Sequence, residues 1–258
     1  MPLARINGIK FNYKVEGRGR PLVMISGIGL PLGSLNRQAA VLKKHFTVVR
    51  LDNRGAGKTD KPAGPYSTPT MAEDVIGLMD LLKIGKADVF GYSMGGMIAQ
   101  EVALGHPDRL EKLVLCATYS CIDKESGPTP EVGKLAGLSG ADYLRAFLKL
   151  VSGSAARRFF WFWKMALTSS AESRAGFRAQ LAACQTHNTV QRLGSIRAST
   201  LVVVGTNDRL IRPQSSEVLA REIPHARLTR IPNGSHLIPI ERANDLSAVV
   251  LQFLLPPS

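Results

Sequence analysis

Short runs of apolar residues, many of them β-branched, recur along the chain without alternating with polar positions. A strand that other elements cover on both faces has this pattern, because neither face meets water. The runs predict strands at 21–25, 46–51, 87–90, 112–116, 200–204 and, from a weaker signal, 226–231. We therefore expect a mostly parallel sheet with helices on both faces.

The N-terminal segment differs from these runs because its apolar and polar residues alternate. The alternation lies on both sides of Asn7-Gly8, a dipeptide that tolerates the positive φ angles of a tight hairpin turn. We expect residues 5–6 and 9–15 to pair as an antiparallel hairpin at the start of the fold.

Segments of helical length separate the predicted strands. Residues 70–82 carry apolar side chains at helical spacing and begin at Thr70, a candidate N-cap that Glu73 follows three residues later. Residues 94–104 run up to Gly105-His106-Pro107, a sequence typical of a helix end. This alternation of strands and helices predicts an α/β fold, in which a doubly wound sheet is connected by right-handed crossovers.

The alternation stops in the middle of the chain. Between residues 118 and 193 there is no clear strand, and strand character resumes near residue 200. The patterns in this stretch predict helices at 141–151, 155–167 and 171–184. We therefore expect residues 1–117 and 194–258 to form one α/β core, with residues 118–193 inserted in it as a helical cap.

Residues 91–95 read Gly-Tyr-Ser-Met-Gly and fit the pattern Gly-x-Ser-x-Gly between a predicted strand and a predicted helix. A serine in so sharp a turn needs small residues two positions away on either side, because a Cβ there would collide with neighbouring backbone. The turn presents the Ser93 hydroxyl above the sheet, beside a helix N-terminus whose free N–H groups favour negative charge. Ser93 is therefore the candidate nucleophile.

A serine hydroxyl is a weak nucleophile and needs an adjacent base, which an acid must orient. Asp208 comes just after the predicted strand at 200–204, and His236 follows the next strand. Ser, Asp and His occur in the order expected for nucleophile-elbow hydrolases. Loops at the carboxyl ends of parallel strands form the ligand site in open α/β sheets. His236 is thus the candidate base, and Asp208 is the candidate acid.

The oxyanion that forms when serine attacks a carbonyl needs hydrogen-bond donors, which backbone N–H groups supply. One donor is expected at Met94, directly after the nucleophile. The other is expected in the loop after the first parallel strand, where Ile28 stands in the sequence Ser26-Gly27-Ile28-Gly29. This chemistry requires no metal and no organic cofactor.

These motifs resemble those of the α/β-hydrolase superfamily, and the resemblance covers essentially the whole chain. Residues 52–60 look like the family's Asp-x-Arg-Gly-x-Gly-x-Ser loop, and residues 234–241 look like its histidine segment. The resemblance implies an α/β-hydrolase fold, a mostly parallel doubly wound sheet with an N-terminal hairpin and a helical cap insertion. It implies Ser93, Asp208 and His236 as the catalytic residues.

Within the superfamily, the chain resembles the subgroup of 3-oxoadipate enol-lactonases, carboxylesterases and carbon–carbon bond hydrolases of aromatic degradation. Residues 187–196 are similar to the return from cap to core in that subgroup. The resemblance favours carboxylesterase activity over lactone hydrolysis, with carbon–carbon bond hydrolysis third. A ligand receptor that keeps the triad but signals through cap movement is the non-enzyme alternative.

Three residues are candidates for the substrate pocket. Ser26 stands where members of this subgroup often carry a histidine, so the hydrogen bonds that this histidine side chain makes are lost here, which bears on pocket shape and substrate class. His187 ends the insertion and either contacts substrate or makes a structural hydrogen bond. Trp161 belongs to the aromatic run 159–163, which forms the interior of the cap or roofs an apolar acyl pocket.

One further segment suggests another chemistry. Residues 52–59 end in Gly-Lys-Thr, as a phosphate-binding loop does. However, Asp52 stands where that motif requires glycine, and a carboxylate there would oppose phosphate binding. No metal-ligand motif occurs in the sequence.

The 258-residue chain carries a net charge of +13, with 33 Lys and Arg against 20 Asp and Glu. The basic residues are spread along the chain and accompany no nucleic-acid motif, so we expect a solvated basic surface, with a preference for anionic ligands as the alternative. The substrate is expected to be a small ester or lactone, with no specific nucleic-acid partner. The sequence leaves the oligomeric state open, a homo-oligomer included.

Location is inferred from cysteine usage and from hydropathy. Cys116, Cys121 and Cys184 are irregularly spaced and favour a reducing compartment. The N-terminus lacks the apolar stretch of a secretory signal, and no segment approaches the roughly 20 apolar residues of a membrane span. We therefore expect a soluble, cytoplasmic protein without a membrane span.

Overall fold

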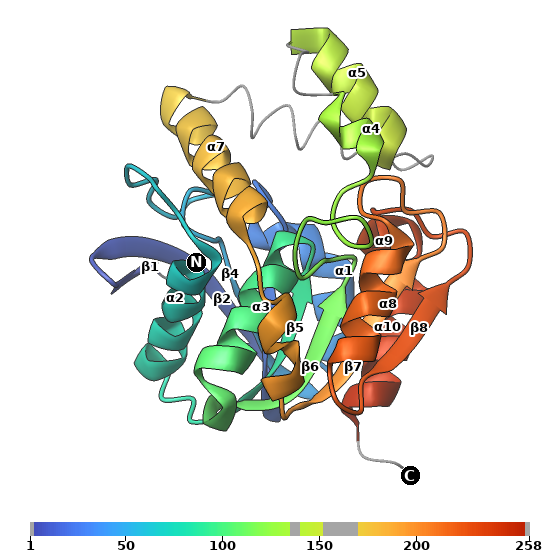
Figure 1. Cartoon of the computed structure of the whole chain (residues 1–258). Coiled ribbons are helices and arrows are strands. Elements are labelled where there is room, and N and C mark those ends of the chain that lie inside the picture. The colour runs from blue at the N-terminus through green and yellow to red at the C-terminus, as the bar shows by residue number, and fades with distance from the viewer. Residues whose placement is uncertain (1–2, 135–139, 152–169, 256–258) are drawn as a thin grey trace.

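The computed structural model describes residues 3–134, 140–151 and 170–255 and contains one eight-stranded sheet of order β1-β2-β4-β3-β5-β6-β7-β8 (Figure 1). Its strands are β1 (Leu3–Ile6), β2 (Ile9–Gly17), β3 (Arg20–Ile25), β4 (Phe46–Leu51), β5 (Ala87–Tyr92), β6 (Leu110–Cys116), β7 (Ser199–Gly205) and β8 (Arg227–Ile231). Strand β2 pairs antiparallel with β1 and β4, and all other neighbours are parallel. The predicted mostly parallel sheet with an N-terminal hairpin is confirmed.

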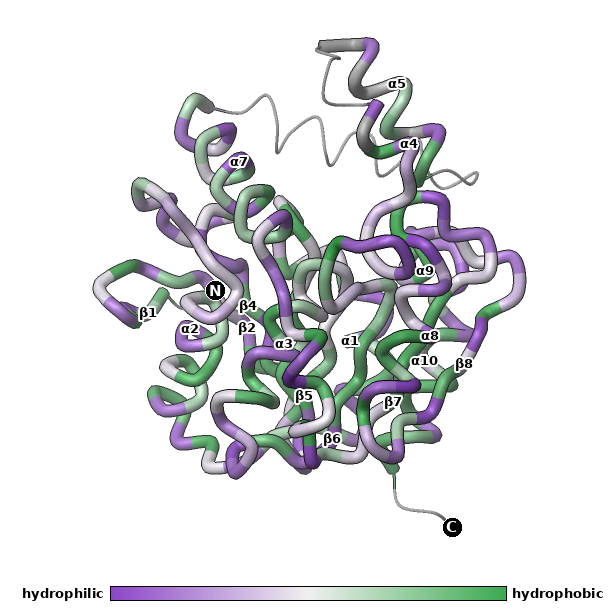
Figure 2. Tube along the Cα trace, in the orientation of Figure 1, coloured by the Kyte–Doolittle hydropathy of each residue, from purple (hydrophilic) through white to green (hydrophobic). Residues whose placement is uncertain are grey.

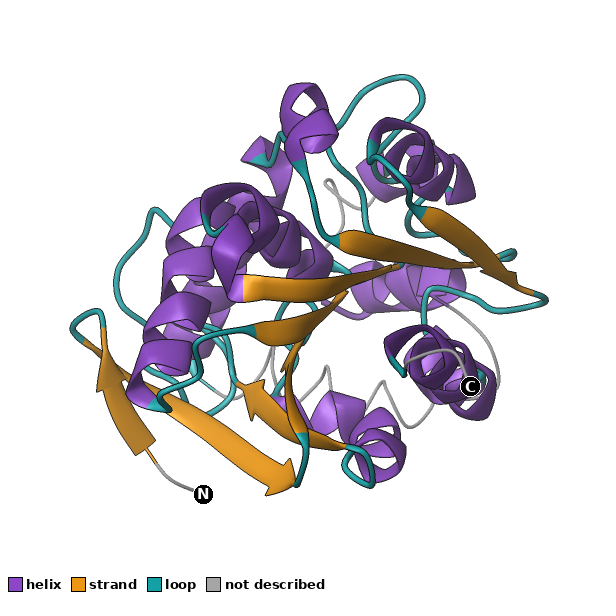
Figure 3. Cartoon of the chain, turned by 90° about the horizontal axis from the view of Figure 1, so that it is seen from below, coloured by secondary structure: helices purple, strands orange, loops and turns teal. Residues whose placement is uncertain are grey.

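Helices lie on both sides of the sheet, as the view from below shows (Figure 3). Those outside the stretch between β6 and β7 are α1 (Asn36–Leu42), α2 (Thr68–Leu81), α3 (Met94–Gly105), α8 (Pro213–Glu222), α9 (Ile238–Glu241) and α10 (Ala243–Leu254). Short 3-10 helices occur at Leu32–Leu35, Pro107–Arg109 and Val190–Ser195. This arrangement is the doubly wound α/β fold that the sequence predicts.

Two apolar clusters explain why the strand sequences do not alternate. In β3, Val23 and Ile25 pack into the cluster that also holds α2 and α3, whereas Leu22 and Met24 pack into the cluster that holds α1 and α10. Successive side chains of a strand point to opposite faces, so each face buries its own apolar set. Figure 2 accordingly shows the central strands as mainly hydrophobic.

The beginning of α2 corrects one detail of the prediction. The N-cap is Ser67, whose hydroxyl accepts a hydrogen bond from the backbone N–H of Thr70, so Thr70 is not the cap. Pro69 stands in the first turn, where its fixed φ favours a helix start and its missing N–H costs nothing. The helix therefore begins two residues earlier than predicted.

Among the described residues between β6 and β7, three α-helices stand over the carboxyl edge of the sheet (Figure 1). They are α4 (Pro130–Gly133), α5 (Gly140–Val151) and α7 (Ala171–Thr186). Helices α5 and α7 match two of the predicted helices, and the third, at 155–167, lies outside the described residues. The division into an α/β core and a cap at residues 118–193 stays a prediction. Over the described ranges, no helix combines the length and the apolar character that crossing a membrane would need.

Candidate active site

Ser93 forms the sharp turn between β5 and α3. Its φ of 56° and ψ of −122° lie in a region that residues with a side chain rarely adopt. A Cβ added to Gly91 would lie 2.3 Å from the carbonyl oxygen of Gly95, and one added to Gly95 would lie 2.2 Å from that of Ile25. Backbone atoms thus leave no room for a Cβ at Gly91 or Gly95, as the Gly-x-Ser-x-Gly motif predicts.

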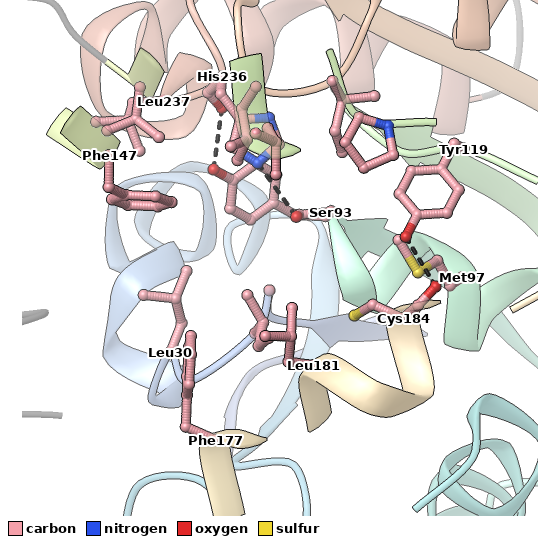
Figure 4. A pocket seen from close by; sticks show the side chains of 18 residues that line it. Leu30, Ser93, Met97, Tyr119, Phe147, Phe177, Leu181, Cys184, His236 and Leu237 are labelled. Carbon is pink, nitrogen blue, oxygen red and sulfur yellow. Dashed lines mark hydrogen bonds between the residues drawn. The ribbon is translucent and has the colours of Figure 1, made fainter. Parts of the chain in front are cut away.

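The structure brings Ser93, His236 and Asp208 together at the carboxyl edge of the sheet, and Figure 4 shows the contact between Ser93 and His236. The Nε2 atom of His236 lies 3.1 Å from the Oγ of Ser93, and its Nδ1 lies 2.8 Å from Oδ2 of Asp208. All three side chains are buried. A base contacts the hydroxyl and a carboxylate contacts the base, which is the geometry of an activated serine.

Backbone contacts fix the orientation of the Asp208 carboxylate. Its Oδ1 atom accepts hydrogen bonds of 2.9 Å from the N–H groups of Leu210 and Ile211, which leaves Oδ2 to His236. The loop that carries Asp208 also contacts the loop of the histidine, since the N–H of Asn207 donates to the carbonyl of Gly234 at 2.8 Å. These contacts hold the acid and the base at a set distance.

The proposed oxyanion donors are the backbone N–H groups of Ile28, in the loop after β3, and of Met94, which directly follows Ser93. Gly27 passes so close that a Cβ there would lie 3.2 Å from the Cβ of Ser93. Met94 is the first residue of α3, where an N–H has no intrahelical acceptor. In the part of the chain that the structure describes, the N–H of Ile28 has no recorded acceptor either. Both donors are therefore available to an oxyanion.

Ser93 and His236 open onto a cavity with a mainly apolar lining (Figure 4). The other described residues around it come from both faces of the sheet edge and from the insertion: Gly27, Ile28, Leu30, Tyr92, Met97, Tyr119, Pro128, Val132, Phe147, Val151, Phe177, Leu181, Cys184, Leu210, Ile211 and Leu237. Across the described ranges, no three His, Cys, Asp or Glu side chains group so that they could hold a metal ion.

Two of the three proposed pocket residues, Ser26 and His187, do not line the cavity. Ser26 is not among the described lining residues, and its hydroxyl accepts a hydrogen bond from that of Ser34 at 3.2 Å. His187 is also absent from the described lining, and its Nδ1 lies 2.9 Å from the hydroxyl of Thr68. The structural hydrogen bond is thus the observed state of His187. Trp161 lies outside the described residues.

Sequence reasoning missed the wall that α7 contributes. Phe177, Leu181 and Cys184 line the cavity at positions i, i+4 and i+7 of this helix. The spacing was visible in the sequence, but the same spacing describes a helix face buried in a core. Only the position of α7 over Ser93 distinguishes the two.

The chain belongs to the alpha/beta hydrolase fold family, whose model matches residues 20–179 and 167–243. It is 31% identical over 267 residues to a 2-hydroxymuconate semialdehyde hydrolase of Pseudomonas putida, and the alignment covers 96% of this chain and 91% of that protein. It is 29% identical over 238 residues to a poly(3-hydroxyalkanoate) depolymerase of Ectopseudomonas oleovorans, and the alignment covers 91% of this chain and 84% of that protein.

A solved structure has the same fold over nearly its whole length. The enol-lactonase from Burkholderia xenovorans superposes with a TM-score of 0.85 at 29% identity, covering 98% of this chain and 99% of that one. The predicted resemblance to the α/β-hydrolase superfamily is confirmed, and the relatives are hydrolases that act on different bonds.

Proposed function

We propose that the protein is a serine hydrolase that cleaves a carboxylic ester through an acyl-enzyme intermediate. The observation that carries this proposal is the contact chain from the Ser93 hydroxyl through His236 to Asp208. It lies at the wall of an apolar cavity, where a substrate carbonyl can approach Ser93 away from bulk water. The substrate is a small molecule.

The first half of the reaction forms the acyl-enzyme. Ser93 Oγ attacks the ester carbonyl while Nε2 of His236 removes its proton, and Asp208 holds the imidazole tautomer and stabilises the imidazolium. The N–H groups of Ile28 and Met94 donate to the oxyanion. The tetrahedral intermediate then expels the alcohol, which takes the proton from His236.

The second half returns the enzyme to its resting state. His236 removes a proton from water, whose oxygen attacks the acyl carbonyl. The second tetrahedral intermediate breaks its bond to Ser93 Oγ, which takes the proton from His236, and the acid is released. A lactone is an internal ester, so the same residues would open it. In that case alcohol and acid leave as one molecule.

The relatives are named for different bonds, and two of the names support an ester. An enol lactone and a poly(3-hydroxyalkanoate) are both joined by carboxylic ester bonds, and two of the compared proteins are named for them. Lactone hydrolysis is the second candidate, because the enol-lactonase shares the fold over nearly the whole chain. We also propose that residues 118–193 act as a cap, since α5 and α7 supply part of the cavity wall.

Hydrolysis of short p-nitrophenyl esters tests the proposal. We expect turnover that Ser93→Ala reduces by at least about 10³-fold, since the nucleophile is removed. Ser195→Ala is the matched control, because Ser195 is exposed and lies in the 3-10 helix before β7. Unchanged turnover in Ser93→Ala, or ligand binding with no turnover in the wild type, would contradict an ester hydrolase.

A further inference from the structure

The residues that line the cavity indicate which acyl groups the enzyme accepts, beyond the type of reaction. We propose that the acyl part of the substrate is uncharged and apolar, an aliphatic acyl group without a carboxylate. This inference rests on the proposed function, because it names the substrate class for the same site.

Apolar side chains surround the approach to Ser93 from three helices. Met97 comes from α3 and Phe147 from α5, and α7 contributes Leu181 and Cys184 (Figure 4). Met97 and Cys184 are buried, whereas Leu181 is 38% exposed. Leu181 is therefore the exposed end of this wall, and an acyl chain that lies along these side chains stays in apolar contact.

The polar groups in the lining already have partners. The hydroxyl of Tyr92 donates to the carbonyl of His236 at 2.9 Å, and that of Tyr119 donates to the carbonyl of Cys184 at 2.8 Å. Burial raises the pKa of both phenols far above the usual range, so they stay protonated donors. Neither hydroxyl therefore has a hydrogen left to donate to a carboxylate on the substrate.

A carboxylate on the acyl chain would find no cation in the described lining, which contains neither Lys nor Arg. A buried charge without a partner loses its hydration and gains nothing in return. Described basic side chains pair on the surface, as Arg230 does with Glu217, or away from the cavity in the interior, as Arg50 does with Glu16.

Two matched esters test the proposal. The p-nitrophenyl esters of hexanoic acid and of adipic acid (monoester) carry the same six-carbon acyl chain, which ends in a methyl group or in a carboxylate. We expect kcat/KM to be at least about 100-fold higher for the hexanoate, because the carboxylate would be buried unpaired. An equal or higher kcat/KM for the adipate ester would overturn the proposal. Turnover of neither ester would overturn the proposed function instead.

A charged substitution in the lining tests whether the cavity itself sets this preference for the uncharged acyl chain. Leu181→Arg places a cation at the exposed end of the wall. We expect it to lower the ratio of kcat/KM for the hexanoate to kcat/KM for the adipate ester by at least about 10-fold. Leu81→Arg adds the same charge at the exposed end of α2, outside the lining, and should leave the ratio unchanged. Equal shifts in both variants would show that net charge alone sets the preference, against the proposal.

A second inference comes from a buried polar side chain on α7. Gln180 is fully buried, and its Oε1 accepts a hydrogen bond of 2.7 Å from the backbone N–H of Gly29. Its Nε2 donates at 2.7 Å to the carbonyl of Arg54. One side chain thus joins the insertion to two loops at the edge of the sheet.

We infer that Gln180 is a positioning residue for the oxyanion site, which again rests on the proposed function. The N–H of Gly29 belongs to the peptide group that follows Ile28, so its hydrogen bond restricts the conformation of Ile28. The N–H of Leu30 donates to the carbonyl of Gly27 at 3.2 Å and closes the same turn. Gln180 therefore holds the turn in the conformation that presents the Ile28 N–H beside Ser93.

Close packing fixes the helix that carries Gln180. A Cβ added to Gly176 would lie 2.5 Å from the carbonyl oxygen of Gly55, so α7 rests directly on the backbone of the loop that includes Arg54. The helix begins at the N-cap Ser170, whose hydroxyl accepts from the N–H of Ser173 at 3.1 Å. A helix held in this way can transmit its position to the turn at Ile28.

Gln180→Leu tests this role. We expect kcat to fall about 10- to 100-fold while KM changes by less than about twofold, because the lost interaction acts only on the transition state. The affinity for an alkylboronic acid, which forms a tetrahedral adduct with serine, should fall by the same factor. If Gln180→Leu does not fold, Gln180→Met is measured with the same expectation.

Gln38→Leu is the matched control, since Gln38 is also fully buried and donates to a backbone carbonyl, that of Pro239, at 2.8 Å. It should lower stability and keep the wild-type affinity for the boronic acid. Wild-type kcat and boronic acid affinity in Gln180→Leu would overturn the inference. An equal loss in Gln38→Leu would do so as well, because the effect would then follow stability alone.

Discussion

The phenol of Tyr92 donates a hydrogen bond of 2.9 Å to the backbone carbonyl of His236, although 144 positions separate the two residues. The residue before the proposed nucleophile thus holds the loop of the proposed base. Their rings also lie close, with centroids 5.5 Å apart. The nucleophile turn and the histidine loop therefore form one unit, and a change at Tyr92 should reach the chemistry through His236.

Tyr92→Phe removes this hydrogen bond with little change in shape. We expect the free energy of unfolding to fall by about 1–2 kcal/mol, since a buried carbonyl loses its donor, and kcat to fall by up to about 10-fold. Tyr66→Phe is the control, because the Tyr66 phenol makes a comparable bond to the carbonyl of Pro62 at 2.7 Å. Denaturant unfolding and ester kinetics on both variants measure the effects. Equal kcat values in the two variants would contradict a role in positioning His236.

Asp208→Asn keeps the size of the side chain but removes the charge that orients His236. We expect kcat to fall about 10³- to 10⁴-fold with little change in KM, because the imidazole is left in the wrong tautomer. Asp245→Asn changes an exposed carboxylate on α10 and serves as the control. Steady-state kinetics at saturating ester would reveal the difference, and a loss below 10-fold in Asp208→Asn would be inconsistent with the proposed role.

Gly95→Ala should prevent the nucleophile turn from forming. The added Cβ would lie 2.2 Å from the carbonyl oxygen of Ile25, and backbone cannot move away as a flexible side chain can. We expect a loss of more than about 2 kcal/mol in the free energy of unfolding. Gly85→Ala is the control, since a Cβ there meets no atom within 4 Å. Similar melting temperatures for both variants would refute the steric argument.

His187 should make the protein less stable in acid. Burial lowers the pKa of His187 from its usual 6.5 to about 3, and the neighbouring Arg192 contributes. Glu101 lies 3.9 Å away, but Arg192 already pairs with both of its oxygens. Between pH 6.5 and 3 the unfolded chain binds a proton that the folded protein excludes. Stability therefore falls as the pH is lowered through this window, and His187 contributes nothing above it.

The expected slope from His187 alone is up to about 1.4 kcal/mol per pH unit. His187→Gln removes the titrating group and should flatten the decline, as urea unfolding at a series of pH values would measure. Identical slopes in the variant and the wild type would mean that His187 is protonated in the folded protein or that its burial is relieved.

The sequence predicts the strands well because each face of the sheet buries its own apolar set, which leaves a continuous signal. The order Ser93, Asp208 and His236 was also readable, since each residue follows a strand at the same edge of the sheet. The cap of α2 was misplaced because Ser67 and Thr70 are both good N-cap residues, and only backbone geometry decides between them.

The cavity was the least predictable part of the site. Which residues meet there depends on how α5 and α7 lie over the sheet, and Phe177 and Leu181 have the pattern of ordinary core residues. Gln180 gives no signal at all, because its partner Gly29 lies 151 positions away. The side-chain chemistry of Ser26 and His187 predicts pocket residues, but in the structure Ser26 contacts Ser34 and His187 contacts Thr68.

The most direct test of the account is to map the site of covalent modification by a fluorophosphonate with mass spectrometry of the digested protein. The account predicts one adduct per chain, on Ser93, with esterase activity lost in proportion to the modified fraction and no adduct in Ser93→Ala. Modification at another residue, or full activity in the fully modified protein, would contradict Ser93 as the nucleophile.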